Sequence, residues 1–318
     1  MRDHPMLVFT GNANPALAQA ICEHIGCELG SATVRPFPDG ELDVKVNTDV
    51  RGSDTFVVQP TCPPVNENLM ELLLLIDCLR RASAARITAV LPYYGYARKD
   101  RKDEGRVPIT AKLVANLITE AGADRVLTLD LHASQIQGFF DIPTDHLLAA
   151  PVFVERLRGE RHDDLVLVGP DVGSIKLARA YAEGLHAGLA VVDKRRMSPD
   201  QTKADFFIGD VRGKNVLLVD DIIATAGSVA EAAALLRKEG AKSIRVVASH
   251  GVFCGPAVER LLAAPIDGIM VTDSIPLPEA ARALNVEVVS IAGLLGDAMT
   301  RIHRNESVSS LLKVNKTT

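Results

Sequence analysis

The stretch VLLVDDIIATAGS, residues 216–228, combines a buried strand, two acids and a run of small residues. Four apolar residues, Val216 to Val219, end at the adjacent carboxylates of Asp220 and Asp221, and an Ala-rich helical pattern follows the small residues. In a parallel sheet, ligands bind beyond the carboxyl ends of the strands, where helix N-termini expose backbone N–H groups. The stretch therefore predicts a strand that ends at the two acids, a ligand-binding turn and a helix.

The residue types in this turn favour a phosphorylated sugar. Small residues let the backbone approach a phosphate closely, and hydroxyl groups add donors; these residues are Ala224, Thr225, Ala226, Gly227 and Ser228. The two carboxylates accept hydrogen bonds and suit the hydroxyls of the sugar. An ordinary helix start is the alternative, with Ser228 as N-cap and Glu231 completing a capping box. That alternative explains Ser228 but leaves the two acids unexplained.

Strands and helices alternate outward from this stretch in both directions. Apolar strand patterns occupy residues 6–12, 54–60, 86–94, 125–132, 165–171, 189–195, 215–222, 243–253 and 268–275. Helical patterns occupy residues 15–26, 68–82, 109–122, 175–185 and 228–240. Near-continuous aliphatic strands between amphipathic helices indicate parallel sheets that helices cover on both faces.

Length and an internal repeat favour two domains. The chain has 318 residues, and domains commonly hold roughly 150 residues each. Residues 112–132 and 231–251 share a helix, a Gly-Ala helix exit and a buried strand. The pattern lapses over DIPTDHLLAAP, residues 141–151, before a new helix. We therefore expect domains at 1–150 and 151–318.

Composition excludes several classes of protein. Aromatic residues make up only 4% of the chain and hydrophobic residues 47%, which favours an α/β protein over a β-sandwich. The net charge is -5, so no global basic field attracts nucleic acid. The apolar stretch Leu69 to Leu79 is interrupted by Glu71 and Asp77 and is too short to span a membrane. Five scattered cysteines show no zinc-binding spacing. Together with the lack of a signal-peptide pattern, they predict a cytoplasmic protein.

Six further motifs narrow the family. They are FPDGE at 37–41, GYARKDRKDEGRVPITAK at 95–112, DLHASQIQGFFDIP at 130–143, GPDVGS at 169–174, DKRR at 193–196 and ESVSSLL at 306–312. In this order they resemble the class I ribose-phosphate pyrophosphokinases, also called phosphoribosyl pyrophosphate synthetases. Residues 216–228 resemble the fingerprint of type I phosphoribosyltransferase folds. The resemblance implies two tandem doubly wound parallel-sheet domains of that fold, with a cleft between the carboxyl ends of their strands. It also implies that the C-terminal segment packs back on the first domain.

The resemblance implies a reaction for nucleotide biosynthesis. ATP and ribose 5-phosphate give phosphoribosyl pyrophosphate and AMP, because the anomeric hydroxyl of the sugar attacks the β-phosphorus. The chain has no GxxxxGK[ST] pattern, so other elements must hold ATP. Two alternatives stay open: a transferase that acts on a base, and a non-catalytic or weakly active regulatory homologue of the same fold. The resemblance also implies a homohexamer whose ATP site is shared between subunits.

Two motifs are the ATP-binding elements that the resemblance implies. Phe37 would stack on adenine, while Asp39 and Glu41, on either side of Gly40, would accept hydrogen bonds from the base. A Pro-Asp-Gly turn would favour the same residues. The second element contains Arg98, Lys99, Asp100 and Asp103, whose cations suit phosphate. A charge run of this kind is otherwise a solvated loop, and most relatives have Gln in place of Lys99.

The resemblance also implies metal-binding and catalytic residues. His132 and Asp171 match the positions that bind Mg²⁺ in the ATP site, although a histidine beside a strand is more often structural. Lys194 and Arg196 match the cations that stabilise charge on the transferred group, and Arg196 also contacts the sugar phosphate. Both lie two residues apart beyond a strand, so one face can carry both, and a solvated strand end is the alternative.

Besides Lys99, three positions differ from the family pattern. Relatives usually have Asp in place of Ala224, Thr in place of Ser228 and Phe in place of Leu312. Ser228 keeps the hydroxyl, and backbone N–H groups carry most of the phosphate binding. We therefore expect sugar binding to survive, with a possible cost in turnover at Ala224.

Overall fold

The computed structural model describes residues 4–160, 164–171, 173–195 and 204–312. These residues divide into two compact units. The first unit holds the chain up to Leu148 together with Ser274–Pro276 and Ser290–Leu312, and the second holds Ala149–Asp273 and Leu277–Val289. The chain therefore leaves the first unit after Leu148 and enters it again near its C-terminus.

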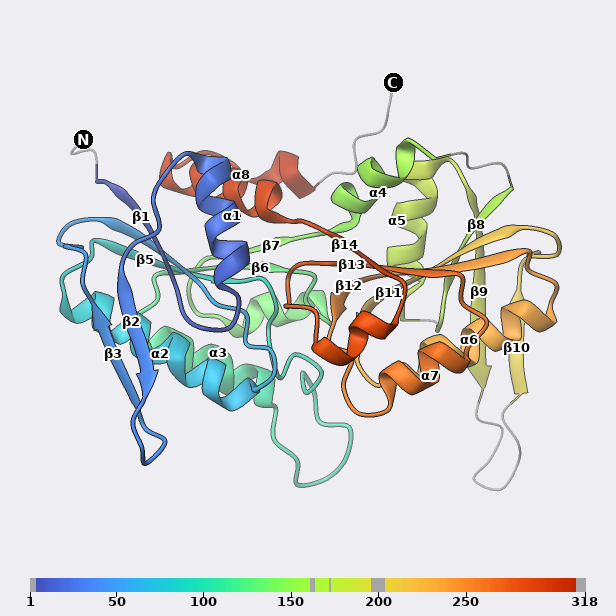
Figure 1. Cartoon of the computed structure of the whole chain (residues 1–318), viewed down its shortest axis with the longest axis horizontal. Coiled ribbons are helices and arrows are strands. Elements are labelled where there is room, and N and C mark those ends of the chain that lie inside the picture. The colour runs from blue at the N-terminus through green and yellow to red at the C-terminus, as the bar shows by residue number, and fades with distance from the viewer. Residues whose placement is uncertain (1–3, 161–163, 172, 196–203, 313–318) are drawn as a thin grey trace. The chain divides into compact units, whose positions relative to one another are not determined.

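A five-stranded parallel sheet forms the centre of the first unit, in the order β1-β4-β5-β6-β7. The strands are β1 (Met6–Thr10), β4 (Asp54–Val58), β5 (Arg86–Leu91), β6 (Arg125–Leu129) and β7 (Thr144–Leu147). Helices α2 (Val65–Arg81) and α3 (Thr110–Ala121) lie on one face, and α1 (Pro15–Ile25) and α8 (Ala292–His303) lie on the other (Figure 1). All five residues of β4 are buried, as expected for a strand covered on both faces.

Helix α8 is held on the first unit near its middle and at its C-terminal end. His24 of α1 lies 2.8 Å from the Asp297 carboxylate, and a Cβ at Gly296 would lie 2.7 Å from the His24 ring. At the C-terminal end, Asp54 accepts hydrogen bonds from His303 Nδ1 at 2.8 Å and from Arg86 Nε at 2.7 Å. A glycine thus lets the two helices approach, and a buried carboxylate anchors the end of α8.

Strand β7 corrects one expectation. We expected a lapse in the pattern over residues 141–151, but Thr144–Leu147 pair with β6 in parallel register. The strand lies at the sheet edge, and only Leu147 is buried. An edge strand needs little apolar character, so TDHL carries no strand signal.

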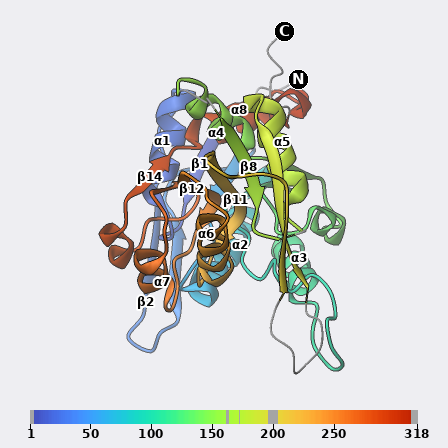
Figure 2. The same cartoon turned by 90° about the vertical axis from the view of Figure 1, so that its right-hand side faces the viewer.

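The second unit has a seven-stranded sheet in the order β10-β9-β8-β11-β12-β13-β14. Its strands are β8 (Leu165–Gly169), β9 (Gly188–Arg195), β10 (Ala204–Ile208), β11 (Asn215–Ile223), β12 (Ser243–Gly251), β13 (Gly268–Thr272) and β14 (Val286–Val289). Its helices are α4 (Ala150–Arg158), α5 (Ile175–Leu185), α6 (Gly227–Lys238) and α7 (Ala257–Ala263). In Figure 2, which looks onto this unit, α5 and α6 lie on opposite sides of the sheet. The predicted fold class, α/β with parallel sheets, is confirmed.

The strand order of the second unit reverses between β8 and β11. The chain runs from β8 outward to β9 and β10, and then returns to pair β11 with the other side of β8. A doubly wound sheet of this kind binds ligands at the point of reversal, beyond the carboxyl ends of its strands. The topology thus selects the ends of β8 and β11 as the candidate site.

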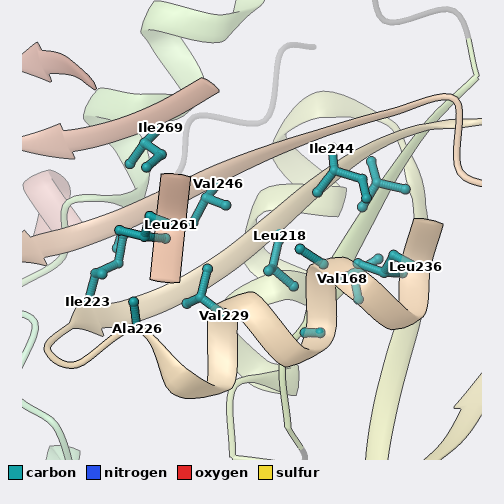
Figure 3. Packing of buried hydrophobic residues seen from close by; sticks show 14 of the residues in the cluster. Val168, Leu218, Ile223, Ala226, Val229, Leu236, Ile244, Val246, Leu261 and Ile269 are labelled. Atoms are coloured by element: carbon teal, nitrogen blue, oxygen red, sulfur yellow. The ribbon is translucent and has the colours of Figure 1, made fainter. Parts of the chain in front are cut away.

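The core of the second unit fixes where α6 begins. Val168, Leu218 and Val246 come from three adjacent strands and pack with Val229 and Leu236 of α6 (Figure 3). Burying an aliphatic side chain of this size contributes about 1.5–3 kcal/mol. This packing holds the turn between β11 and α6 in a defined place.

Three further short strands, β2 (Ala32–Pro36), β10 and β14, have no counterpart in the sequence patterns. Strand β2 forms an antiparallel hairpin with β3 (Leu42–Val46), the strand that follows the Pro-Asp-Gly turn, and β14 lies at a sheet edge. Strand β10 pairs with β9 in the antiparallel direction, so the expectation of wholly parallel sheets was wrong there. Helix α2 begins three residues earlier than expected and α6 begins one residue earlier.

The five cysteines all carry free thiols. Burial raises the pKa of Cys62 to about 11, so this thiol stays protonated and unreactive at neutral pH. Among the helices of the described ranges, none combines the length and apolar character needed to cross a membrane.

Candidate functional site

The acids of β11 lie beside the end of β8. Strand β11 continues to Ile223, so the expectation that it ends at Asp220 and Asp221 was wrong. Strand β8 pairs with β11 only as far as Leu218, while β12 pairs with it to Ile223. The two acids therefore lie within the part of β11 that runs beside β12, but beyond the carboxyl end of β8. Such a position presents polar side chains at the edge where the sheet order reverses.

The carboxyl group of Asp220 has a strongly raised pKa. Burial raises its pKa to about 8, and repulsion from Asp221 and Asp171 adds to the effect. Because β8 is the neighbour of β11, Asp171 after β8 lies at the same sheet edge as the two acids of β11. Neighbouring acids need hydrogen-bond donors or a cation to ionise together. Sugar hydroxyls would supply donors, and a divalent cation would supply positive charge.

The turn after β11 has an unusual backbone. Ala226 occupies the N-cap position of α6 with φ +60°, in the left-handed region. Ser228 is the second residue of the helix, so the alternative with Ser228 as N-cap of a capping box was wrong. The first turn of a helix has N–H groups without intrahelical partners. Left-handed residues next to such groups form concave nests that bind anions.

Asp171 is held in a tight turn after β8. Its Oδ1 accepts a hydrogen bond from the Ser174 N–H at 3.0 Å, and the Ser174 hydroxyl donates to the Asp171 carbonyl at 2.9 Å. A Cβ at Gly169 would lie 2.6 Å from the Ser174 hydroxyl, so the turn requires glycine there. The Asp171 side chain remains exposed.

Lys194 lies at the same sheet edge. Strand β9 runs parallel to β8 with Gly169 opposite Val191, so the backbone of Lys194 lies beyond the end of β8. Arg196, the second predicted catalytic cation, lies outside the described residues.

In the first unit, residues 37–41 form the tip of the β2–β3 hairpin. The Phe37 N–H donates to the Glu41 carbonyl at 2.7 Å, and the Gly40 N–H donates to the Phe37 carbonyl at 2.9 Å. Gly40 has φ +91°, which favours glycine. The Phe37 ring is 45% exposed, and the Asp39 and Glu41 side chains are also exposed. The turn interpretation is thus correct, and it leaves an aromatic face available to a ligand.

The loop after β5 is closed at its base and charged at its tip. The Gly95 N–H donates to the Thr61 hydroxyl at 2.6 Å, and the Ala111 N–H donates to the Lys99 carbonyl at 3.1 Å. Lys99 pairs with Asp103 at 3.1 Å, and this hydrogen bond lowers the pKa of the Asp103 carboxyl. Arg98, the residue before Lys99, is exposed.

His132 lies three residues after β6, and its loop contacts the charged loop. The Gln135 amide donates to Asp100 at 3.3 Å. The Leu131 N–H, next to His132, donates to His146 Nε2 at 2.9 Å. His146 belongs to the unpredicted strand β7, so the sequence held no signal for this contact. The loops that follow the adjacent strands β5 and β6, which carry Arg98 and His132, thus lie at one edge of the sheet and are joined by the Gln135–Asp100 hydrogen bond.

The structure therefore gathers the predicted residues into two sets. The first unit holds Phe37 to Glu41, Arg98 to Asp103 and His132, while the second holds Asp171, Lys194, the β11 acids and the turn. Within the described ranges, no group of three or more His, Cys, Asp or Glu side chains is arranged to hold a metal ion. Carboxylate oxygens such as those of Asp171 fit Mg²⁺, which commonly takes one or two protein carboxylates and otherwise substrate oxygens and water.

Comparisons with known proteins cover nearly the whole chain. Residues 6–122 match the N-terminal domain of ribose phosphate pyrophosphokinase, and residues 196–313 match a phosphoribosyl synthetase-associated domain. A ribose-phosphate pyrophosphokinase of Rhodopirellula baltica is 55% identical, with 96% of this chain and 98% of that protein covered. One from Caldanaerobacter subterraneus is 53% identical, with 96% of each covered. The crystal structure of phosphoribosylpyrophosphate synthetase from Mycobacterium smegmatis matches with a TM-score of 0.89 at 40% identity, over 95% of this chain and 99% of that one.

Proposed function

The chain belongs to the ribose-phosphate pyrophosphokinase family, and we propose that it transfers the β,γ-pyrophosphoryl group of ATP to the C1 hydroxyl of ribose 5-phosphate. The products are phosphoribosyl pyrophosphate and AMP. The observation that supports the assignment of residues is the reversal of strand order at β8 and β11. At this point the two acids of β11, the left-handed turn and the start of α6 follow one another along the chain. Acids suit the hydroxyls of a sugar, and the turn and helix start suit its phosphate.

Ribose 5-phosphate binds at the β11 segment in this proposal. Asp220 and Asp221 accept hydrogen bonds from the sugar hydroxyls, which lowers the cost of ionising a buried acid. The turn from Ala224 to Ser228 receives the 5-phosphate with its backbone N–H groups and hydroxyls. Ala224 offers its backbone even without the carboxylate that relatives have.

ATP binds through elements of the first unit. The exposed Phe37 ring stacks on the base, and Asp39 and Glu41 accept from its amine. Arg98 and Lys99 pair with phosphate, Asp103 positions the Lys99 side chain, and Gln135 bonds the neighbouring Asp100. These contacts orient the nucleotide, which accounts for much of the barrier reduction in phosphoryl transfer.

Mg²⁺ is the cofactor in this proposal, and the family resemblance assigns Asp171 and His132 as the residues that would hold it. When bound, it supplies positive charge to the phosphate oxygens of ATP. Lys194 and Arg196 stabilise the negative charge that the transferred group gains in the transition state.

Assembly and location follow from the family resemblance. We expect a homohexamer in which the hairpin tip of one subunit completes the ATP site of another, and the exposed Phe37 ring supports this. Free thiols at all five cysteines support a cytoplasmic location. Analytical ultracentrifugation measures the assembly directly.

Product analysis tests the reaction. The protein is mixed with ATP, ribose 5-phosphate and magnesium, and nucleotide products are separated by chromatography. We expect AMP in equal amount to phosphoribosyl pyrophosphate, with neither product when ribose 5-phosphate is omitted. Absence of AMP would overturn the proposal and favour a regulatory homologue. Consumption of added phosphoribosyl pyrophosphate with a purine or pyrimidine base would instead favour a base transferase.

A further inference from the structure

Three consecutive carbonyl groups of the sugar-phosphate turn are bonded to protein donors. The Ala224 carbonyl accepts from the Cys254 N–H at 2.9 Å, and the Ala226 carbonyl accepts from the Ala230 N–H at 3.0 Å. Between them, the Thr225 carbonyl accepts from Arg260 Nη1 at 3.0 Å. Protein donors therefore hold the carbonyl groups of all three residues in place.

Fixing these carbonyls also fixes the N–H groups that follow them. In a trans peptide the C=O and the next N–H point in opposite directions. The only cis peptide bond among the described residues joins Pro63 and Pro64. The N–H groups of Thr225, Ala226 and Gly227 consequently face away from the three donors. They form a row of the kind that binds a phosphate.

Arg260 holds the middle one of the three carbonyls. The outer two carbonyls are bonded to backbone groups, whereas the middle one depends on a single side chain from α7. The peptide that it holds leads into Ala226, whose left-handed conformation is costly for a residue with a Cβ. A Cβ at Gly227 would lie 3.4 Å from Arg260 Nη1, so the guanidinium also lies against the next residue. Figure 3 shows Leu261, the neighbour of Arg260 in α7, near the end of β11, where Ile223 and Ala226 also lie.

We propose that Arg260 is a positioning residue for ribose 5-phosphate. By binding the Thr225 carbonyl, it turns the Ala226 N–H toward the 5-phosphate. This role rests on the proposed function of the turn. It predicts an effect on the use of the sugar and not on the use of ATP, because the Thr225–Ala226 peptide belongs to the sugar-phosphate turn.

Steady-state kinetics of Arg260→Met and Arg260→Lys tests the role. Arg282→Met is the matched control, because Arg282 is an exposed arginine of the same unit that bonds Glu279. We expect Arg260→Met to raise KM for ribose 5-phosphate about tenfold, the effect of losing one charge-assisted hydrogen bond, with KM for ATP and the melting temperature unchanged. Arg260→Lys keeps a charged donor and should recover part of the loss, while Arg282→Met should match the wild type.

The outcomes separate this inference from the proposed function. A wild-type protein that forms no AMP would overturn the proposed function and this role with it. An active wild type together with an unchanged KM for ribose 5-phosphate in Arg260→Met would overturn the role alone. Equal rises in both KM values would also overturn it, because they would indicate a general structural effect. If Arg260→Met does not fold, Arg260→Ala replaces it, because this exposed helix position tolerates alanine, and a wild-type KM for the sugar in that variant counts against the role.

Discussion

Replacing Asp220 with Asn should change the pH dependence of stability in the absence of ligands. Burial raises the pKa of Asp220 from its ordinary value of 3.8 to about 8, with Asp221 and Asp171 adding repulsion. The folded protein therefore holds a proton that the unfolded chain releases above pH 4. Stability from this group is fully present below pH 4 and is lost as the pH rises toward 8. Asn carries no proton to lose, so Asp220→Asn should not show this loss.

The size of the effect follows from linkage. One proton that is bound in the folded state only changes the free energy of unfolding by about 1.4 kcal/mol for each pH unit. Between pH 5 and 7, the free energy of unfolding of Asp220→Asn should therefore rise relative to that of the wild type by up to about 1.4 kcal/mol for each pH unit. Urea denaturation followed by circular dichroism measures this, since the chain has no Trp. Amide exchange of β11 peptides assigns the change to the second unit.

Asp210→Asn provides the control for this comparison. Asp210 is exposed in the same unit, and its Oδ1 accepts the Arg212 N–H, a bond that Asn can keep. We expect the control to follow the wild-type curve. A difference between Asp220→Asn and wild type that stays constant from pH 5 to 7 would show that Asp220 is ionised in the free protein. The reasoning about the acid cluster would then be refuted.

Three further predictions concern Lys194 and Ala224 of the second unit and Gly95 in the loop after β5. Lys194→Ala should lower kcat by roughly 100-fold or more while ATP affinity measured by equilibrium binding is kept, because a cation that meets developing charge acts mainly on the rate; near-normal kcat would make Lys194 a surface lysine. Ala224→Asp should raise kcat by up to about tenfold if the added carboxylate gains one hydrogen bond to the sugar, and an unchanged or lower kcat in the same assay would contradict this. Gly95→Ala should lower the free energy of unfolding by about 1–3 kcal/mol, because its Cβ would lie 2.4 Å from the Thr61 carbonyl oxygen. An unchanged melting temperature would contradict this, since it would show that the backbone around Gly95 shifts at little energetic cost.

Most central strands could be predicted because burial on both faces leaves aliphatic runs in the sequence. Strands β4 and β11 contain the uninterrupted apolar runs 56–58 and 216–219. Edge strands carry no such signal, and TDHL of β7 is mostly polar. The reversal of strand order at β8 likewise depends on pairings between distant segments, which periodicity does not encode.

The candidate site was predictable in its residue types and less so in its geometry. The acids and small residues of β11 and its turn stand next to each other in the sequence, so their chemistry could be inferred directly. The left-handed conformation of Ala226 could not, because alanine ordinarily avoids that region. Contacts from Arg260 and His146 come from segments at least 15 residues away. Neither residue belongs to a motif, so only the folded chain reveals their partners.

In the proposed function, the two acids of β11 hold the hydroxyls of ribose 5-phosphate. Steady-state kinetics of Asp220→Asn with varied ribose 5-phosphate tests this most directly, with Asp210→Asn as the matched control. We predict a sharp rise in KM for ribose 5-phosphate, at least about tenfold, with KM for ATP close to that of the wild type, because the amide can turn a donor toward a sugar hydroxyl. An unchanged KM for ribose 5-phosphate in Asp220→Asn would contradict the account, since the acids of VLLVDDIIATAGS would then not hold the sugar.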